Sequence, residues 1–528
     1  MKTILGLGLG LIFCLGNFHL RAQTLNEGMK AFEKQEYSKA LQIFSALQIN
    51  NPKDGASYYW MGKTYLELEN PSQATQIFQK GITTLPKYGL NYVGAGKMNL
   101  LQKNTPEAKK QFDKALELTQ SNNVEVLTDI ADAWLADGSK EGLGEAEKLL
   151  IKAKTLDSKN VFVYTSLGDL YLRQKIDELA LTNYRKSIAL DPTFLIGYLR
   201  VGQLYVKNKQ YNDGAAAFRE AIAKDASFAP AYRELGELYY LSKKYEEAKN
   251  NYRKYVDLSG NDLAARARYA SFLFLTEEYP AALSEIDNVL KDTTTLVMLR
   301  LKGYCLLKAG NGPEAQKVMD QYFKLIPPQY ILGSDLEYYA KILEKNGQDS
   351  VAIGYYEQAI LKDSSLITLK ADIGTNYIRQ KKYDKAAEVY EEIVTRTPGY
   401  KNYYDLGKAY YFMKAYDKAH IAFEKMTTLQ PGVHLGYLWK GNALAKQEDQ
   451  ENPEGKAKPD FEKVVEIITT NNTIEKYKKD FITANSYLAA FYFIKEDKVN
   501  ALKYATVVTG LEPEHPQCKQ MVEYLNKK

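Results

Sequence analysis

The stretch LGELYYLSKKYEEAKNNYRKYV, residues 235–256, carries a spacing of residue types that returns along the chain. A Leu-Gly pair opens it, a Tyr follows three residues after the Gly, and an Ala follows twelve residues after the Gly. The same skeleton is found in MGKTYLELENPSQATQIFQKGI (61–82), LGDLYLRQKIDELALTNYRKSI (167–188) and LGKAYYFMKAYDKAHIAFEKMT (406–427). Self-similarity at a fixed period is typical of proteins built from stacked repeats.

The repeat extends over nearly all of the 528 residues, and most of its steps are 33 or 34 residues long. The small residues that mark the register are Gly28, Gly62, Gly96, Ala131, Gly168, Gly202, Gly236, Ala270, Gly303, Ala340, Gly374, Gly407, Gly441 and Ala489. Sixteen residues after many of them stands an aromatic residue: Phe44, Phe78, Phe112, Tyr184, Phe218, Tyr252, Tyr356, Tyr390 and Phe423. A Gly inside a helix costs about 0.5–1 kcal/mol relative to Ala, so its return indicates a packing demand.

This pattern resembles the tetratricopeptide repeat (TPR), whose unit is two helices joined by a turn. The resemblance implies an all-α fold, a right-handed α-solenoid superhelix of about fourteen helix-turn-helix units over residues 23–514. The small residues let the two helices of a unit approach, and the aromatic residue fills the space between units. HPQCKQMVEYLNKK, residues 515–528, is predicted to be a C-terminal capping helix, because the end of a repeat array needs a polar outer face.

Two units are longer than the others, with insertions near 137–145 and 446–459. Both insertions fall between the two helices of a unit. They are interpreted either as plain surface loops, which repeats tolerate, or as loops that contact a partner or bend the superhelix.

Residues 1–22 have the features of a secretory signal peptide. Lys2 precedes an apolar stretch from Ile4 to Leu15, and the small residue Ala22 offers a cleavage site. The sequence therefore predicts an exported, periplasmic protein. No later stretch is long and apolar enough to cross a bilayer, so the mature chain is expected not to span the membrane.

Composition and motifs argue against several classes of function. The formal charge is only +5 and there is no basic run, which disfavours nucleic acid as a partner. The histidines after the signal segment, His420, His434 and His515, lack the spacing of metal ligands. NYVGAGKMN resembles a phosphate-binding loop, but Asn91 replaces its first Gly and Met98 its Ser or Thr. We expect no metal, no cofactor and no catalysis; an enzyme with an unrecognised site is the third-ranked alternative.

Partner binding is expected on the first helix of each unit. In TPR proteins the second, fifth, ninth and twelfth positions of a unit face the concave groove, and the last three form one stripe of a helix. Tyr, Arg and Lys in this stripe suit a partner segment with aromatic or carboxylate groups, since Tyr and Arg are frequent binding anchors. The same aromatic residues are also consistent with packing against neighbouring units. The groove residues predicted in this way are Arg233, Glu237, Tyr240, Arg300, Tyr304, Lys401, Tyr404, Lys408 and Tyr411.

A second resemblance concerns the cellular setting. NPEGKAKPDFEKVVEI, residues 452–467, is similar to a stretch found late in exported TPR proteins of Gram-negative bacteria, which are often associated with outer-membrane transport. The predicted function is a non-catalytic scaffold or adaptor in the cell envelope that binds segments of envelope proteins in its groove. The alternative is a glycan- or peptidoglycan-binding protein that uses a Tyr-lined groove.

Overall fold

The computed structural model describes residues 24–260 and 262–527, so the predicted signal segment 1–22 lies outside the described residues. The chain forms two compact units that divide between Thr293 and Thr294. Every regular element among the described residues is helical: 29 α-helices and two short 3₁₀ turns. The predicted all-α TPR solenoid fold is therefore confirmed.

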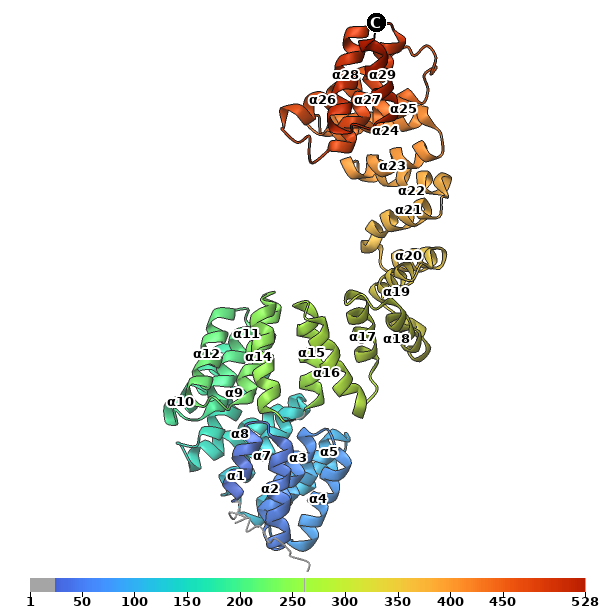
Figure 1. Ribbon diagram of the computed structural model, residues 1–528. Helices are drawn as coiled ribbons and strands as arrows, with labels where there is room; N and C mark the ends of the chain where they lie inside the picture. The colour runs from blue at the N-terminus through green and yellow to red at the C-terminus, as the bar shows by residue number, and fades with distance from the viewer. Residues whose placement is uncertain (1–23, 261, 528) are drawn as a thin grey trace, which may run out of the picture. The chain divides into compact units, whose positions relative to one another are not determined.

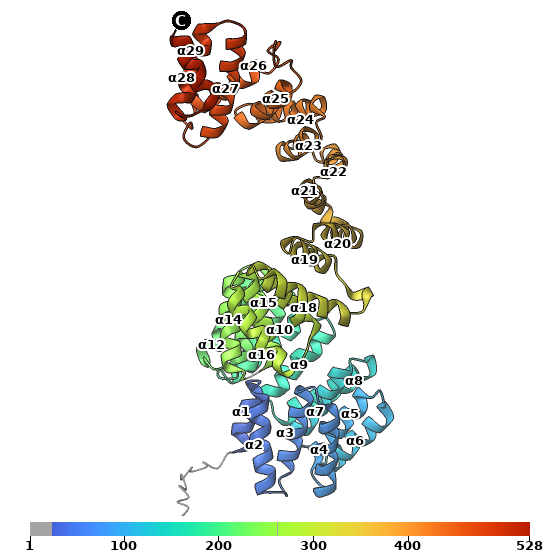
Figure 2. The same ribbon diagram turned by 45° about the vertical axis from the view of Figure 1, so that its right-hand side comes forward.

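The N-terminal unit contains eight helix pairs (Figures 1 and 2). They are α1 (Leu25–Glu33) and α2 (Tyr37–Asn50), α3 (Gly55–Glu67) and α4 (Pro71–Thr84), α5 (Gly89–Leu101) and α6 (Thr105–Leu118), α7 (Val124–Asp137) and α8 (Lys140–Leu156), α9 (Val161–Arg173) and α10 (Asp177–Leu190), α11 (Leu195–Lys207) and α12 (Tyr211–Lys224), α13 (Ala229–Leu241) and α14 (Tyr245–Leu258), and α15 (Leu263–Leu275) and α16 (Tyr279–Asp292).

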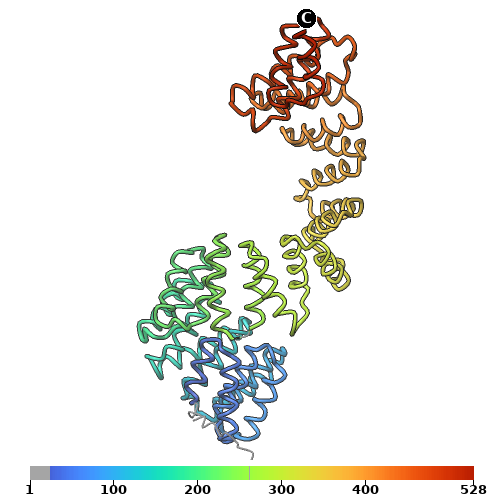
Figure 3. The backbone as a smooth tube through the Cα atoms, in the orientation of Figure 1, coloured from blue at the N-terminus to red at the C-terminus, as the bar shows by residue number. Residues whose placement is uncertain are grey.

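The C-terminal unit contains six helix pairs and a last single helix, which follow one another in chain order along the tube of Figure 3. They are α17 (Leu296–Lys308) and α18 (Gly312–Leu325), α19 (Gly333–Lys345) and α20 (Asp349–Lys362), α21 (Lys370–Arg379) and α22 (Tyr383–Arg396), α23 (Tyr400–Phe412) and α24 (Tyr416–Leu429), α25 (His434–Ala445) and α26 (Lys458–Thr470), α27 (Lys478–Ile494) and α28 (Lys498–Leu511), and α29 (Pro516–Asn526). The 3₁₀ turns are η1 (Pro328–Tyr330) before α19 and η2 (Ser364–Leu369) before α21.

The small residues of the repeat lie where the two helices of a pair approach each other most closely. A Cβ atom added at Gly202 would lie closer than 3.0 Å to the ring of Phe218, and one at Gly236 would lie equally close to the ring of Tyr252. Real Cβ atoms essentially never come so near to another side chain. Gly is therefore needed at these positions because an aromatic ring of the second helix occupies the place of its side chain.

Three of the four repeats that carry Ala at this position have a smaller side chain opposite. Ala270 is matched by position with Ile286 and Ala489 with Ala505, and all four side chains are fully buried. In the longer unit, Ala131 belongs to the same buried cluster as Leu150. Ala340 is the exception, since Tyr356 stands opposite it in the repeat. A Gly on the first helix thus generally faces an aromatic ring on the second helix, and an Ala faces a smaller side chain.

The two longer units differ from each other. Near residue 137 the extra residues lengthen the second helix: α8 has 17 residues, and it begins at Lys140, directly after the turn at Gly138. This insertion is therefore part of a helix and not the surface loop considered for it. Residues 446–457 do form a loop between α25 and α26.

The loop between α25 and α26 is held by its own backbone and by residues at α27 and just after it. The buried carboxylate of Glu448 accepts hydrogen bonds from the backbone N–H groups of Lys456 and Ala457 and from the hydroxyl of Tyr487 on α27, the last at 2.7 Å. Lys495 also donates to Asn452, at 2.6 Å. A loop held at both ends by side chains of its own unit presents a defined surface.

No helix in the described part of the chain is both long and apolar enough to cross a membrane.

Replacing Gly236 by Leu tests the close approach of α13 and α14. The new side chain would need the space that the Tyr252 ring fills, and such overpacking typically costs about 1–3 kcal/mol. We expect faster amide hydrogen exchange across residues 229–258, measured by mass spectrometry.

The matched control is Gly144→Leu in α8, because a Cβ atom at Gly144 meets nothing within 4 Å. This change should leave stability unchanged or raise it by up to about 1 kcal/mol through helix propensity. Equal effects of the two substitutions would contradict the packing described above.

Candidate functional site

The predicted groove residues come from three first helices, α13, α17 and α23, and the structure places them in different environments. On α13 and α17, Arg233, Glu237, Arg300 and Tyr304 are bound by side chains of other repeats in the same compact unit. On α23, Tyr404, Lys408 and Tyr411 lie at an aromatic cluster, and Lys408 has no acidic partner among the residues that the structure describes.

Arg233 on α13 is held by an element far away in sequence. Its Nη1 donates to Oε1 of Gln35 at 2.7 Å, and its Nη2 pairs with Glu234 at 3.1 Å. The guanidinium also lies 5.9 Å from the ring centre of Tyr255. The predicted groove anchor Arg233 is thus occupied by contacts within the N-terminal unit.

Glu237 and Tyr240 both contact a residue of the next repeat. Arg268 on α15 forms two hydrogen bonds with the Glu237 carboxylate, at 2.9 and 2.7 Å, and its guanidinium lies 4.6 Å from the centre of the Tyr240 ring. The hydroxyl of Tyr252 donates to Glu237 at 2.6 Å. Although burial raises the pKa of Glu237, hydrogen bonds from Arg268 and Tyr252 outweigh it and lower that pKa. This cluster connects two repeats.

On α17, Tyr304 and Arg300 face the buried carboxylate of Asp335. This residue of α19 is fully buried and accepts hydrogen bonds from the hydroxyls of Tyr304 at 2.6 Å and Tyr322 at 2.8 Å. It also accepts from the backbone N–H of Leu332 at 2.9 Å, and Arg300 lies 3.8 Å away. The hydrogen bonds made by Asp335 fasten α17 and α18 to α19, so Arg300 and Tyr304 have a structural role.

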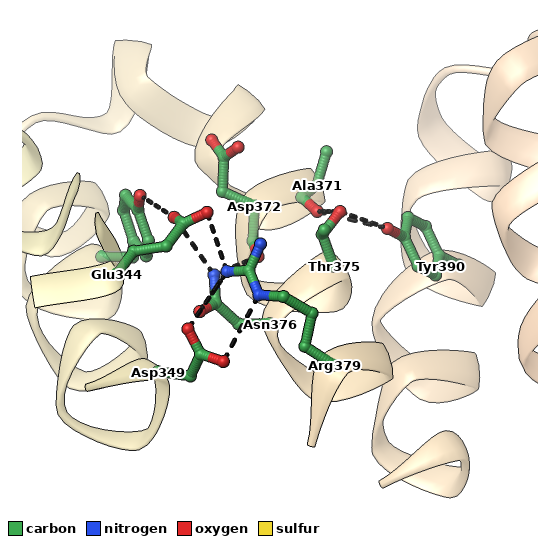
Figure 4. A network of polar contacts seen from close by, with 9 residues as sticks. Glu344, Asp349, Ala371, Asp372, Thr375, Asn376, Arg379 and Tyr390 are labelled. Carbon is green, nitrogen blue, oxygen red and sulfur yellow. Dashed lines mark hydrogen bonds and ion pairs between the residues drawn. The ribbon is translucent and has the colours of Figure 1, made fainter. Parts of the chain in front are cut away.

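A further polar network connects α19, α20 and α21 (Figure 4). Arg379 pairs with Glu344 at 2.7 Å and with Asp349 at 3.2 Å, and the Glu344 carboxylate also accepts from Tyr356 at 2.7 Å. Burial raises the pKa of nearby Asp372, and the positive charge of Lys341 opposes that rise. The network lies beside the irregular turn η2, where α21 begins late and has only ten residues.

The α23 residues form a different arrangement, which we call the α23 site: Tyr404, Lys408, Tyr411 and, from α25, Trp439. The Trp439 ring contacts Tyr404 at 6.0 Å and Tyr411 at 5.3 Å between ring centres, both nearly perpendicular. Lys408 Nζ lies 5.0 Å from the centre of the Tyr404 ring. Burial raises the pKa of both tyrosines, so they remain neutral hydroxyl groups.

The two lysines of the α23 helix differ in their ion pairs, although Asp405 and Asp480 are both near enough to Tyr404 to add to the rise of its pKa after burial. Lys401, the fourth predicted residue of this helix, is largely exposed and pairs with Asp405 at 2.8 Å. Lys408, in contrast, has no carboxylate partner within the described part of the chain. Its ammonium group therefore remains available to an anionic group of a ligand, next to partly exposed aromatic rings.

Sequence reasoning missed Arg268, Asp335 and Trp439. Each lies on the first helix of the unit after the one it contacts, outside the four positions considered for the groove. The signal that could have found Trp439 was its rarity, since the chain has three Trp residues. No group of three or more His, Cys, Asp or Glu side chains is placed to hold a metal ion in residues 24–260 and 262–527.

Replacing Asp335 by Ala should loosen the α17–α19 junction. Two buried tyrosine hydroxyls would lose a charged acceptor, and hydrogen bonds to charged groups contribute about 1.5–3 kcal/mol each. Urea unfolding followed by hydrogen exchange over residues 296–345 measures the loss. The control is Glu466→Ala, which removes an exposed ion pair with Lys463 that solvent screens. A loss at Asp335 no larger than at Glu466 would contradict the structural role.

Comparison with known proteins agrees with the repeat fold. Family models described as tetratricopeptide repeat match residues 199–262, 55–87 and 400–432. No protein of curated function matches the chain. A crystal structure of the C-terminal part of a TPR repeat-containing protein from Cytophaga hutchinsonii is 32% identical, with a TM-score of 0.45, over 48% of this chain and 99% of that one.

More distant solved structures also match. A chain of the APC/C hetero-tetramer Cut9–Hcn1 is 14% identical over 79% of this chain and 95% of that one, with a TM-score of 0.34. A chain of human IFIT1, solved as a dimer with m7Gppp-AAAA, is 12% identical over 78% of this chain and 96% of that one, with a TM-score of 0.37. With its repeat models and a relative matched at 32% identity over nearly its whole length, the chain belongs to the tetratricopeptide repeat proteins.

Proposed function

We propose that this protein is a non-catalytic scaffold of the bacterial cell envelope that binds an extended segment of a partner protein at the α23 site. TPR repeats generally mediate protein–protein interaction, which supports the class of function. The single observation that carries the choice of site is Lys408, a cation without a carboxylate partner among the described residues, beside three aromatic rings.

The other predicted groove residues support this choice by contrast. Arg233, Glu237 and Tyr304 already bind groups of their own unit, so a partner would have to displace those contacts. Displacement of a charge-assisted hydrogen bond weakens binding, because the freed partner must be solvated or paired again. A partner that binds Lys408 and the rings of Tyr404, Tyr411 and Trp439 would not have to break an ion pair of Lys408. A partner segment that carries a carboxylate next to an aromatic side chain would satisfy both features.

The envelope setting rests on sequence features alone. The segment 1–22 has the composition of a signal peptide and predicts export to the periplasm, with association to the outer membrane through partners. The stretch 452–467, similar to a segment of exported TPR proteins, supports a role beside an outer-membrane transport system. In the structure this stretch spans the end of the fixed loop and most of α26, so its exposed residues offer a second contact surface.

A glycan is the alternative ligand for the same site. Tyr404, Tyr411 and Trp439 are only partly buried, and aromatic rings are common platforms for sugars. The lone cation favours a protein segment instead, because neutral sugars do not need Lys408.

Photo-crosslinking in intact cells tests the proposal. A photo-reactive residue at position 401, which is largely exposed one turn from Tyr404, should capture a discrete envelope protein. The same residue at position 425, exposed on the second helix α24, is the control and should not capture it. Mass spectrometry identifies the adduct, and fractionation checks export.

A charge reversal in the position-401 background sharpens the result. Lys408→Glu should reduce the adduct about tenfold or more, because it replaces an attraction by a repulsion, whereas Lys425→Glu should leave it unchanged. Equal adducts from positions 401 and 425, or an adduct insensitive to Lys408→Glu, would refute the site. An exported, folded chain without any protein adduct would favour the glycan.

A further inference from the structure

The N-terminal unit contains a contact that adjacent-repeat packing does not explain. Repeats of a solenoid normally touch only their neighbours. Here Lys34 Nζ, after α1, donates to Ser227 Oγ at 2.7 Å and pairs with Asp225 at 2.7 Å, although 193 residues separate Lys34 from Ser227. Gln35 accepts from Arg233 across 198 residues. At about 34 residues per repeat, the contact spans roughly six repeats.

The carboxylate that accepts from Lys34 is oriented by hydrogen bonds within its own turn. Asp225 lies in the turn between α12 and α13, where its Oδ1 accepts hydrogen bonds from the N–H and the hydroxyl of Ser227, at 2.8 and 2.6 Å. The same turn recurs two helices earlier, where Asp191 accepts from the N–H and the hydroxyl of Thr193. No lysine is paired with Asp191 within the described part of the chain. The Lys34–Asp225 ion pair is therefore specific to this repeat, whereas the Asp-Ser or Asp-Thr turn itself occurs in both.

The donor side is fixed by the turn that ends α1. Gln35 adopts a left-handed backbone conformation, with φ of 60°, which a non-glycine residue rarely takes. Its N–H and that of Glu36 donate to the carbonyls of Phe32 and Ala31. This turn follows the C-terminal end of α1 and places Lys34 beside Asp225 and Ser227, and Gln35 beside Arg233 of α13.

We propose that Lys34, Gln35, Asp225, Ser227 and Arg233 form a latch that closes the first turn of the N-terminal superhelix on itself. The latch is polar and partly exposed, with 25% of the Lys34 side chain and 32% of the Asp225 side chain accessible. Contacts of this kind are weak and screened by salt, so the latch can open without unfolding of the repeats.

The latch has a closed state, in which these contacts are formed, and an open state, in which they are broken. The two states differ in the groups that Arg233 can bind. In the closed state Arg233 is held by Gln35 and Glu234. A ligand with a carboxylate that binds Arg233 must compete with these contacts, so by linkage its binding and the opening of the latch favour each other. The latch is thus an autoinhibitory contact over this part of the first-helix surface.

The latch responds to salt and not to ordinary changes of pH. Burial raises the pKa of Asp225, but hydrogen bonds from Lys34 and Ser227 outweigh it and lower that pKa to about 2. A carboxylate with a lowered pKa keeps its ion pair above that value and loses it only as the pH falls through it. Burial lowers the pKa of Arg233, but the charge and hydrogen bond of Glu234, together with Tyr255, outweigh this effect and raise that pKa above its usual value.

Hydrogen exchange of the full chain tests the latch on the side opposite to each mutation. Asp225→Lys should speed exchange in residues 25–36 about fivefold, and Lys34→Glu should do the same in residues 225–235. Asp191→Lys, which alters the same turn without a facing lysine, should leave residues 25–36 unchanged. The double variant Lys34→Glu with Asp225→Lys should restore slow exchange, because the pair forms with reversed charges.

Salt gives a second readout on the unmodified protein. Raising the ionic strength from about 0.05 M to about 0.5 M shortens the screening length and should speed exchange in residues 25–36. Asp225→Lys should abolish this salt response. Exchange in residues 25–36 that changes neither with Asp225→Lys nor with salt would overturn the latch, as would equal effects of Asp191→Lys and Asp225→Lys.

Discussion

The close approach between a small residue on each first helix and a large side chain on the second helix is the constraint on which the rest of this structure depends. Gly407 and the fully buried Phe423 show it in its simplest form, since a Cβ atom on Gly407 would lie closer than 3.0 Å to the ring. Because this contact recurs every 33 or 34 residues in most units, each helix pair has nearly the same geometry. Stacking of nearly identical pairs then produces a superhelix.

Apolar residues meet the packing demand, so the polar side chains of the first helices are free to take other roles. Several of them connect neighbouring repeats. Asp335 fastens α17 and α18 to α19, Arg379 connects α19, α20 and α21, and Arg268 joins Glu237 to Tyr240. The function proposed here resides in Lys408, whose ammonium group lies against the Tyr404 ring and forms no ion pair with any carboxylate in residues 24–260 and 262–527.

Much of the fold could be predicted from the sequence, because the period and the residue types of the repeat act locally. Gly236 and Tyr252 are only sixteen residues apart, and their sizes alone indicate that they pack together. The roles of Arg233 and Tyr304 could not be predicted in this way. Their partners, Gln35 and Asp335, belong to other repeats, and their contact depends on how repeats are rotated relative to one another.

The conformation of the turns and the structure of the two insertions could not be predicted from the sequence either. The left-handed conformation between paired helices falls on residues such as Lys209 and Lys243, which carry no sequence signal for it, whereas a Gly would have shown it. The extra residues near 137 lengthen α8 because Ser139 caps the helix early, its hydroxyl accepting from the N–H of Gly142. A buried Glu448 fixes the other insertion, and burial of a charged residue is not visible in a loop sequence.

A double-mutant cycle at Gly202 and Phe218 tests the central claim, the matching of sizes within each helix pair, most directly. The variants are Gly202→Ala, Phe218→Ile and both together, so that the double variant copies the Ala270 and Ile286 pair of the same chain. Urea unfolding should show that the double variant is at least about 1 kcal/mol more stable than the sum of the single losses predicts. Additive losses, within about 0.5 kcal/mol, would show that the two positions do not constrain each other and would contradict the account.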